Sequence, residues 1–135
     1  MVKEISEIAE HLYEGLGPGH KDKTYRDAMA LELQERGYIV KTEVPSNIVY
    51  TTKTGKTMIL GSQKVDICAN KDGKYTFIEI RVMLSFLKGK DDIDEVNYLK
   101  TRKYLSSMGL EEGILINFPF PPMDDVEIIE NKVGQ

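Results

Sequence analysis

Two carboxylates and two cations stand close together in the middle of the chain, within residues 63–82 (QKVDICANKDGKYTFIEIRV). Two alternating runs flank the turn-forming sequence Asn-Lys-Asp-Gly, which predicts a β-hairpin. Because successive side chains of a strand point to opposite faces, Asp66 and Glu79 are expected to lie opposite the apolar side chains. Lys64 and Arg81 each lie two residues from one of these acids. Two carboxylates on neighbouring strands, with cations beside them, could hold a divalent metal over a phosphate.

The same residues allow a simpler interpretation. Asp66 could pair with Lys64, and Glu79 with Arg81, as solvated ion pairs on the outer face of a sheet. Exposed ion pairs of this kind are common and contribute little to stability. The spacing alone leaves both interpretations open.

The elements that must position the hairpin can be predicted from apolar spacing. Two amphipathic helices are expected over residues 2–14 and 21–36, ended by the Gly-rich residues 15–19 and by Gly37. The other predicted elements are strands over residues 38–44, 48–52 and 57–60, a helix over residues 91–108, and strands over residues 113–118 and 126–130.

Local signals set several of these boundaries. The sequence Pro-Ser-Asn at residues 45–47 predicts a turn between two strands. Asp91 and Asp92 suit the start of a helix, where the helix dipole favours acids. Residues 113–118 (GILINF) form a continuous apolar run, typical of a strand buried on both faces. The resulting order of helices and strands predicts an α/β or α+β fold, with helices packed on a sheet.

Composition limits the class of protein. The 135 residues suit one domain spanning residues 1–135, with a short tail from about residue 131. The net charge of −4 argues against extensive contact with phosphates, although bound cations could offset local carboxylates. A single cysteine excludes an internal disulfide and suits the reducing cytoplasm. No apolar run reaches transmembrane length, so no membrane association is expected.

Several motifs occur in an order that resembles a known family. They are Leu16-Gly17-Pro18-Gly19, Asp22 with Tyr25, Glu43-Val44-Pro45, Lys64-Val65-Asp66-Ile67, Ile78-Glu79-Ile80-Arg81 and the segment from Tyr104 to Phe118. Together they resemble the GxxExxY proteins, which belong to the PD-(D/E)XK, restriction-endonuclease-like nuclease superfamily. The resemblance covers roughly residues 3–118.

This resemblance implies a restriction-endonuclease-like fold, a mixed central sheet flanked by helices. It implies that Asp66 and Glu79 are ligands of Mg²⁺ or Mn²⁺ at a catalytic centre for phosphodiester hydrolysis. Asp22, Tyr25 and Lys64 would be auxiliary residues.

Three departures from the family pattern bear on activity. Arg81 stands where the superfamily has a lysine, and an arginine can bind phosphate but is a poor general base. Lys100 lies where the third helix of the family usually carries a glutamine, so it could supply the lost charge. Asp22 replaces a glutamate and has a shorter reach, and its position also suits a first-turn carboxylate that stabilises its helix. Tyr25 suits a core aromatic as well as a site residue.

Three hypotheses for function follow. The first is a nuclease that requires Mg²⁺ or Mn²⁺ and acts on nucleic acid, with Asp66, Glu79, Arg81 and Lys100 as the catalytic set. The second is a binding module for nucleic acid or a protein partner that has lost turnover, as the change to Arg81 and the acidic charge both favour. The third is a structural subunit in which the carboxylates are surface charges. A homodimer is compatible with each of them.

Overall fold

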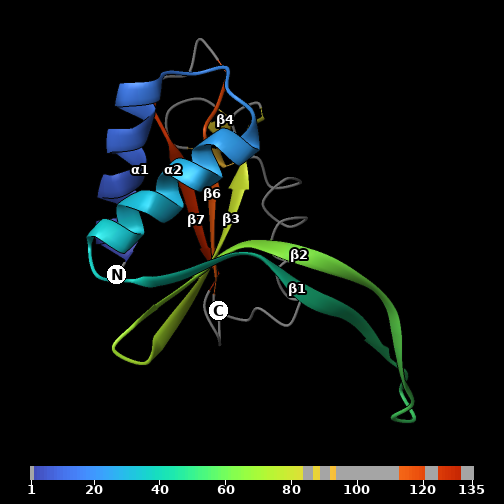
Figure 1. Cartoon of the computed structure of the whole chain (residues 1–135). Coiled ribbons are helices and arrows are strands. Elements are labelled where there is room, and N and C mark those ends of the chain that lie inside the picture. Colours follow the sequence, from blue (N-terminus) through green and yellow to red (C-terminus); the bar gives the residue numbers. More distant parts are fainter. Residues whose placement is uncertain (1, 84–86, 89–91, 94–112, 121–124, 132–135) are drawn as a thin grey trace.

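The computed structural model describes residues 2–83, 87–88, 92–93, 113–120 and 125–131. A five-stranded sheet has the order β1-β2-β3-β6-β7, and two helices pack on it (Figure 1). Its β3–β6 pair is parallel and its other pairs are antiparallel, so the predicted mixed sheet of an α+β fold is confirmed. The elements are α1 (Val2–Leu16), α2 (Asp22–Glu35), β1 (Ile39–Thr51), β2 (Thr57–Lys71), β3 (Lys74–Arg81), β4 (Leu87–Lys88), β5 (Asp92–Ile93), β6 (Gly113–Asn117) and β7 (Glu127–Asn131).

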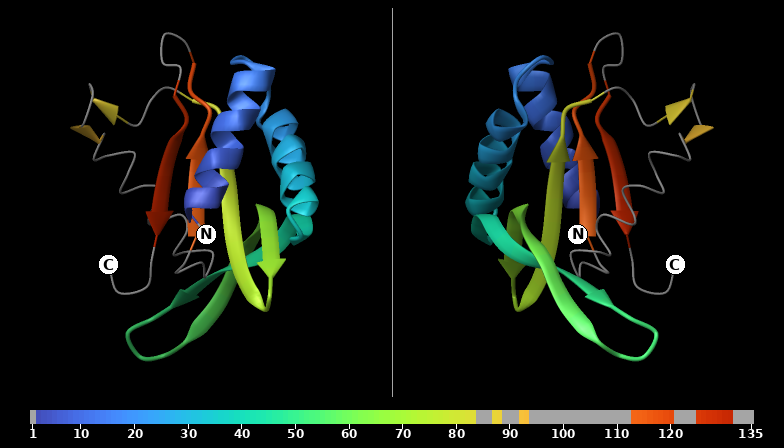
Figure 2. Two further views of the ribbon diagram at one scale, coloured as in Figure 1. Left: turned by 90° about the vertical axis from the view of Figure 1, so that its left-hand side faces the viewer. Right: turned by 90° about the vertical axis from the view of Figure 1, so that its right-hand side faces the viewer.

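Both described helices cover the same face of the sheet, and the small β4–β5 pair lies on the other side (Figure 2). The apolar stripe of α1 recurs at helical spacing and is buried, as the sequence predicts. The helices and strands share one core, which includes Ile5, Ile8, Tyr25, Met29, Leu33, Ile67, Ile78, Ile80, Ile116 and Phe118. Within the described residues, no helix is both long and apolar enough to cross a bilayer.

The central hairpin forms where the sequence predicts it. β2 and β3 are joined by Asp72 and Gly73, and both residues have positive φ, at 54° and 82°. A two-residue loop with positive φ at both positions matches the twist of the flanking strands, which explains the Asp-Gly sequence. The alternation also holds, because Ile78 and Ile80 are fully buried among the core side chains. The hairpin therefore places the Glu79 side chain on the face of the sheet opposite that of Ile78 and Ile80.

The predicted turn at residues 45–47 is wrong. β1 runs without interruption through Pro45, which is opposite Lys64 of β2 in the strand register. β1 is the outermost strand of the described sheet, and an edge strand tolerates proline because only one of its sides is paired. The strand predicted over residues 57–60 is likewise the first part of β2.

In the later part of the chain, one predicted element boundary is wrong and others are confirmed. The predicted helix cannot begin at Asp92, because Asp92–Ile93 is strand β5; the rest of residues 91–108, including Lys100, lies outside the described residues. β6 is buried at all five positions, as predicted. β7 begins and ends one residue later than expected, and the predicted tail beyond it, residues 132–135, is outside the described part.

A two-stranded arm extends from the body (Figure 1). β2 pairs with β3 only from Ile67 to Lys71, whereas its pairing with β1 begins at Thr57. The outer parts of β1 and β2 therefore have only each other as neighbours among the described strands. We use "the arm" for residues 47–62.

Candidate functional site

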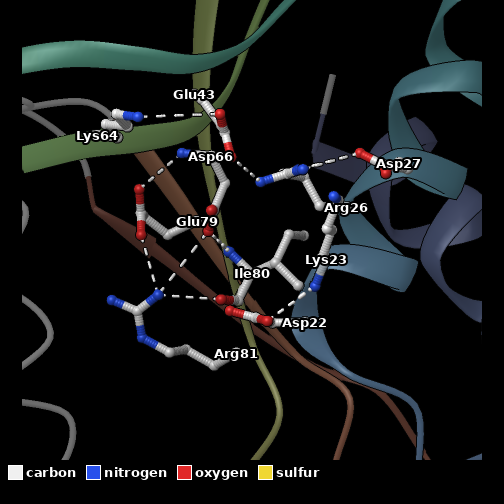
Figure 3. Close-up of polar contacts among 10 residues, drawn as sticks. All are labelled: Asp22, Lys23, Arg26, Asp27, Glu43, Lys64, Asp66, Glu79, Ile80 and Arg81. Carbon is white, nitrogen blue, oxygen red and sulfur yellow. Dashed lines mark hydrogen bonds and ion pairs between the residues drawn. The ribbon is translucent and has the colours of Figure 1, made fainter.

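The candidate site lies where β2 and β3 diverge. Their last backbone pair before the divergence is Ile67 with Ile78, and Asp66 and Glu79 follow on the two strands. The backbone N–H of Asp66 donates a hydrogen bond to Glu79 Oε1 at 3.0 Å, and the N–H of Ile80 donates to Asp66 Oδ2 at 2.8 Å (Figure 3). Each carboxylate thus accepts from the backbone of the other strand, and this exchange holds both side chains in place.

Burial and proximity make these carboxylates unusual. Glu79 is 1% exposed, while Asp66 is half-buried. Burial and the neighbouring Asp66 charge raise the pKa of Glu79 to about 6, against the opposing effect of Arg81. Burial also raises the pKa of Asp66, which the hydrogen bond from Ile80 and the charge of Arg81 partly offset. The site therefore favours a bound cation or a proton.

Arg81 supplies that positive charge in the structure. Its Nη1 lies 3.0 Å from Glu79 Oε2, donates to the carbonyl oxygen of Ile80 at 3.0 Å, and lies 3.9 Å from Asp66 Oδ2 (Figure 3). A single guanidinium nitrogen thus faces two carboxylate oxygens and one carbonyl oxygen. Such oxygens are the donors that small hard cations prefer, so Nη1 lies where a divalent ion would find its ligands.

The protein supplies only some of the ligands that a metal ion would need at this site. Among the described residues, no group of three or more His, Cys, Asp or Glu side chains is placed to hold a metal ion. Asp66 and Glu79 would provide two carboxylates, with the Ile80 carbonyl as a third donor. Mg²⁺ is often bound through one or two carboxylates and keeps several waters, so these donors suit it if Arg81 moves aside.

Asp22 lies in the first turn of α2, whose N-terminal end approaches the C-terminal end of β3 (Figure 1). Its Oδ1 accepts a hydrogen bond from the backbone N–H of Lys23 at 2.8 Å. Its charge also contributes to the raised pKa of Asp66, although burial is the main cause. Asp22 therefore stabilises the start of α2 and also lies within electrostatic reach of the site.

Tyr25 and Lys64 contact residues other than the two carboxylates. Tyr25 is fully buried, stacks on Phe118 with ring centroids 4.3 Å apart, and donates to the Gly17 carbonyl at 2.6 Å. Its contacts are those of a core aromatic. Lys64 is well exposed, and its Nζ is 4.0 Å from Glu43 rather than beside Asp66.

Arg26 and Glu43 extend the site and were not predicted from the sequence as site residues. Arg26 Nη1 lies 3.0 Å from Glu43 Oε1, and its charge lowers the pKa of Asp66 against the effect of burial. Glu43 has a φ of 54°, a left-handed conformation that is unusual for a residue with a side chain. In the strand register it falls opposite Asp66, between the pairs of Thr42 and Val44. Backbone strain of this kind gathers at functional sites, which supports a role for this region.

A sequence signal for Arg26 did exist. Asp22 and Arg26 are four residues apart and share one face of α2, so a helix that brings Asp22 to the site also brings Arg26.

Cys68 is a buried free thiol whose pKa is raised by burial. A thiol in such a setting stays protonated and is a poor metal ligand.

Comparison with known proteins identifies the family of this chain. The family model of the PD-(D/E)XK nuclease superfamily matches residues 1–129. A solved structure described as "Crystal structure of SSO0001" is similar over 98% of this chain and 67% of its own, at 20% identity and a TM-score of 0.46. No curated protein matches the chain. The match over residues 1–129 takes in both carboxylate strands and the helices that support them, and the chain belongs to the PD-(D/E)XK nuclease superfamily.

Proposed function

We propose that this chain is a nuclease that requires Mg²⁺ or Mn²⁺ and hydrolyses phosphodiester bonds in nucleic acid. One observation carries the proposal. Oxygens of Asp66, Glu79 and Ile80 converge on a single cationic nitrogen, that of Arg81. A divalent cation held by the same oxygens supplies Lewis-acid activation of a phosphodiester and of water.

The chain's own residues have distinct roles in this proposal. Asp66 and Glu79 present ionised oxygens at fixed positions, because each is held by the backbone of the opposite strand. Arg81 leaves Glu79 and donates to phosphate oxygens, for which its planar guanidinium is well suited. Arg81 keeps its proton at all working pH values, so proton removal from water falls to another group. We also propose that the chain belongs to the GxxExxY group within the superfamily. We further propose that it acts in the cytoplasm.

A second function is favoured by the position of Arg81. Its guanidinium already pairs with Glu79 and contacts the Ile80 carbonyl, so it offsets part of the carboxylate charge without a metal. A chain that kept this internal cation would be a binding module of nuclease fold, without turnover. The two functions differ in whether a divalent cation can displace Arg81.

Calorimetric titration with Mn²⁺ is the direct test of the site. The wild type is expected to bind saturably, and Glu79→Ala to lose binding, because it removes a carboxylate ligand. Glu79→Gln keeps the shape and removes the charge, so it should also lose binding while retaining the fold. Glu35→Ala, at an exposed acid at the end of α2, is the matched control and should bind like the wild type.

The outcomes separate the two functions. Binding that depends on Glu79, followed by Mn²⁺-dependent cleavage of DNA or RNA that Glu79→Ala abolishes, would support the nuclease. Equal titration curves for wild type and Glu79→Ala would overturn it. Absence of Glu79-dependent Mn²⁺ binding, together with binding of nucleic acid by the folded chain, would instead favour the binding module.

A further inference from the structure

Glu43 is an internal anion held between two cations. Its Oε1 lies 3.0 Å from Arg26 Nη1, and its Oε2 lies 4.0 Å from Lys64 Nζ. Figure 3 shows this carboxylate between the guanidinium from α2 and the ammonium from β2. Each carboxylate oxygen therefore faces a different cation. Two oxygens of a phosphate group suit the same arrangement, because guanidinium and ammonium groups bind carboxylate and phosphate alike.

Arg26 has a second anchor besides Glu43. Its side chain is only 11% exposed. Asp27 Oδ1 accepts a hydrogen bond from Arg26 Nε at 3.1 Å and also lies 3.1 Å from Nη2. Asp27 thus holds the Nε–Nη2 edge of the guanidinium, while Nη1 faces Glu43. The guanidinium therefore keeps its orientation toward this position when the Glu43 carboxylate leaves it.

The Glu43 side chain is 51% exposed, so its carboxylate can turn to solvent without disturbing the core. Its φ of 54° is one that glutamate rarely adopts. The strand register is unchanged across this position, from the pair Thr42–Ile67 to the pair Val44–Val65. An inserted residue therefore does not explain the strain, whereas holding the carboxylate between its two cations does.

This internal ion cluster lies next to the candidate metal site. Glu43 falls opposite Asp66 in the strand register. Lys64 precedes Asp66 by two residues on β2, so both side chains project from the same face of that strand. An anion bound by Arg26 and Lys64 would therefore lie beside the carboxylates that are the candidate metal ligands.

We propose that Arg26 and Lys64 form a binding site for a backbone phosphate of nucleic acid, and that Glu43 occupies this site until the phosphate displaces it. The assignment of the ligand as nucleic acid rests on the proposed function. Under that function, the phosphate held here belongs to a nucleotide next to the one whose phosphodiester is cleaved. The site itself needs neither a metal nor cleavage.

The exchange leaves the local charge nearly unchanged. A phosphodiester carries one negative charge, as does the carboxylate that it replaces. The charge of Asp66 opposes any anion at this position, but the backbone N–H of Ile80 and the guanidinium of Arg81 partly offset it. The incoming phosphate therefore meets the same two cations and the same opposing charge as the Glu43 carboxylate does.

The test is binding of a short labelled DNA oligonucleotide with 5′-hydroxyl ends, as a single strand and as a duplex, measured by fluorescence anisotropy in EDTA. Glu43→Gln removes the competing charge and should bind about tenfold more tightly than the wild type, the scale of one charge-assisted contact. Glu43→Gly removes the carboxylate and the backbone strain together, and should show the same gain. Circular dichroism shows that each variant is folded.

Two controls separate this site from a general effect of charge. Glu35→Gln removes one exposed acid at the last residue of α2, and it should bind within about twofold of the wild type. In an Arg26→Gln background, Glu43→Gln should lose most of its gain, because the cation that it releases is absent. A general effect of charge would give the same gain with or without Arg26.

Three results would overturn the proposal. They are no binding of either oligonucleotide by any variant, no gain in Glu43→Gln and Glu43→Gly, and a full gain in Glu35→Gln or in the Arg26→Gln background. A gain seen only with inorganic phosphate in calorimetry, or only with 5′-phosphate ends, would assign the cations to a free or terminal phosphate and overturn the backbone assignment. Because EDTA excludes metal and cleavage, failure here leaves the Mn²⁺ titration of Glu79 unaffected.

Discussion

Burial of the Glu79 carboxylate destabilises the folded chain at neutral pH. Its pKa of about 6 in the folded chain lies above the ordinary value of 4.5, so the fold prefers the protonated acid. Below about pH 4.5 the carboxyl is protonated in both folded and unfolded chains, and there is no penalty. Above about pH 6 the fold must hold an ionised group that it disfavours, at a cost of about 2 kcal/mol.

Replacing Glu79 with glutamine should therefore stabilise the protein at neutral pH. Glu79→Gln removes the charge and keeps an oxygen that can accept from the Asp66 N–H. We expect the free energy of unfolding in urea to rise by about 1–2 kcal/mol at pH 8, with little change at pH 4.5. Glu35→Gln, at an exposed position, should change it by less than about 0.5 kcal/mol at either pH. A loss of stability at pH 8 would mean that the pairing of Glu79 with Arg81 outweighs the cost of burial.

At the proposed metal site, the same pKa would set the pH dependence of metal binding. Protons and Mn²⁺ would compete for Glu79, and the proton would win as the pH falls below about 6. We expect the apparent affinity for Mn²⁺ to drop roughly tenfold between pH 7.5 and pH 5, because only about a tenth of Glu79 is then ionised. Calorimetry at the two pH values measures this change. An affinity independent of pH over this range would exclude Glu79 as a ligand.

At the scale of elements, the parts that were predictable are those governed by local pattern. The β2–β3 hairpin follows from alternation and the Asp72-Gly73 turn, and β6 follows from its unbroken apolar run. The same alternation placed Asp66 and Glu79 together. β1 was divided wrongly because Pro45 signals a turn locally, while its pairing with β2 keeps the strand continuous.

The missed part of the site depends on contacts between elements. Arg26 comes from α2 and Glu43 from β1, and they meet only because the helix packs over the sheet. The left-handed conformation of Glu43 has no signal in its residue type, since glutamate rarely adopts it. Tertiary packing decides both features.

Replacing Tyr25 tests whether this residue of α2 supports the site only by packing in the core or also acts on the site directly. Tyr25→Phe keeps the stack on Phe118 and removes the hydrogen bond to the Gly17 carbonyl. We expect a loss of about 1 kcal/mol in the free energy of unfolding, with an unchanged affinity for Mn²⁺. Tyr50→Phe, on the exposed arm, is the control and should change neither quantity. Weaker Mn²⁺ binding by folded Tyr25→Phe would show that the hydroxyl acts on the site.

For the whole molecule, the divergence of β2 and β3 would link metal binding at the proposed site to global stability. Backbone pairing ends at Ile67 and Ile78, and beyond it the two strands are joined through Asp66 and Glu79. A cation bound by both carboxylates joins the two strands at this point. Because the unfolded chain does not hold these residues together, binding should shift the folding equilibrium toward the native state.

Thermal unfolding with and without Mn²⁺ measures this link. At a Mn²⁺ concentration about 100 times the dissociation constant, the wild type should gain about 2.7 kcal/mol, seen as a higher midpoint. Arg81→Ala should be less stable than the wild type without metal, because it leaves Asp66 and Glu79 without their nearest cation. At the same Mn²⁺ concentration, Arg81→Ala should gain more stability than the wild type does, because the ion no longer competes with a guanidinium. Glu79→Ala should gain nothing and Glu35→Ala as much as the wild type. If Arg81→Ala gains no more than the wild type, Arg81 does not occupy the position of the metal.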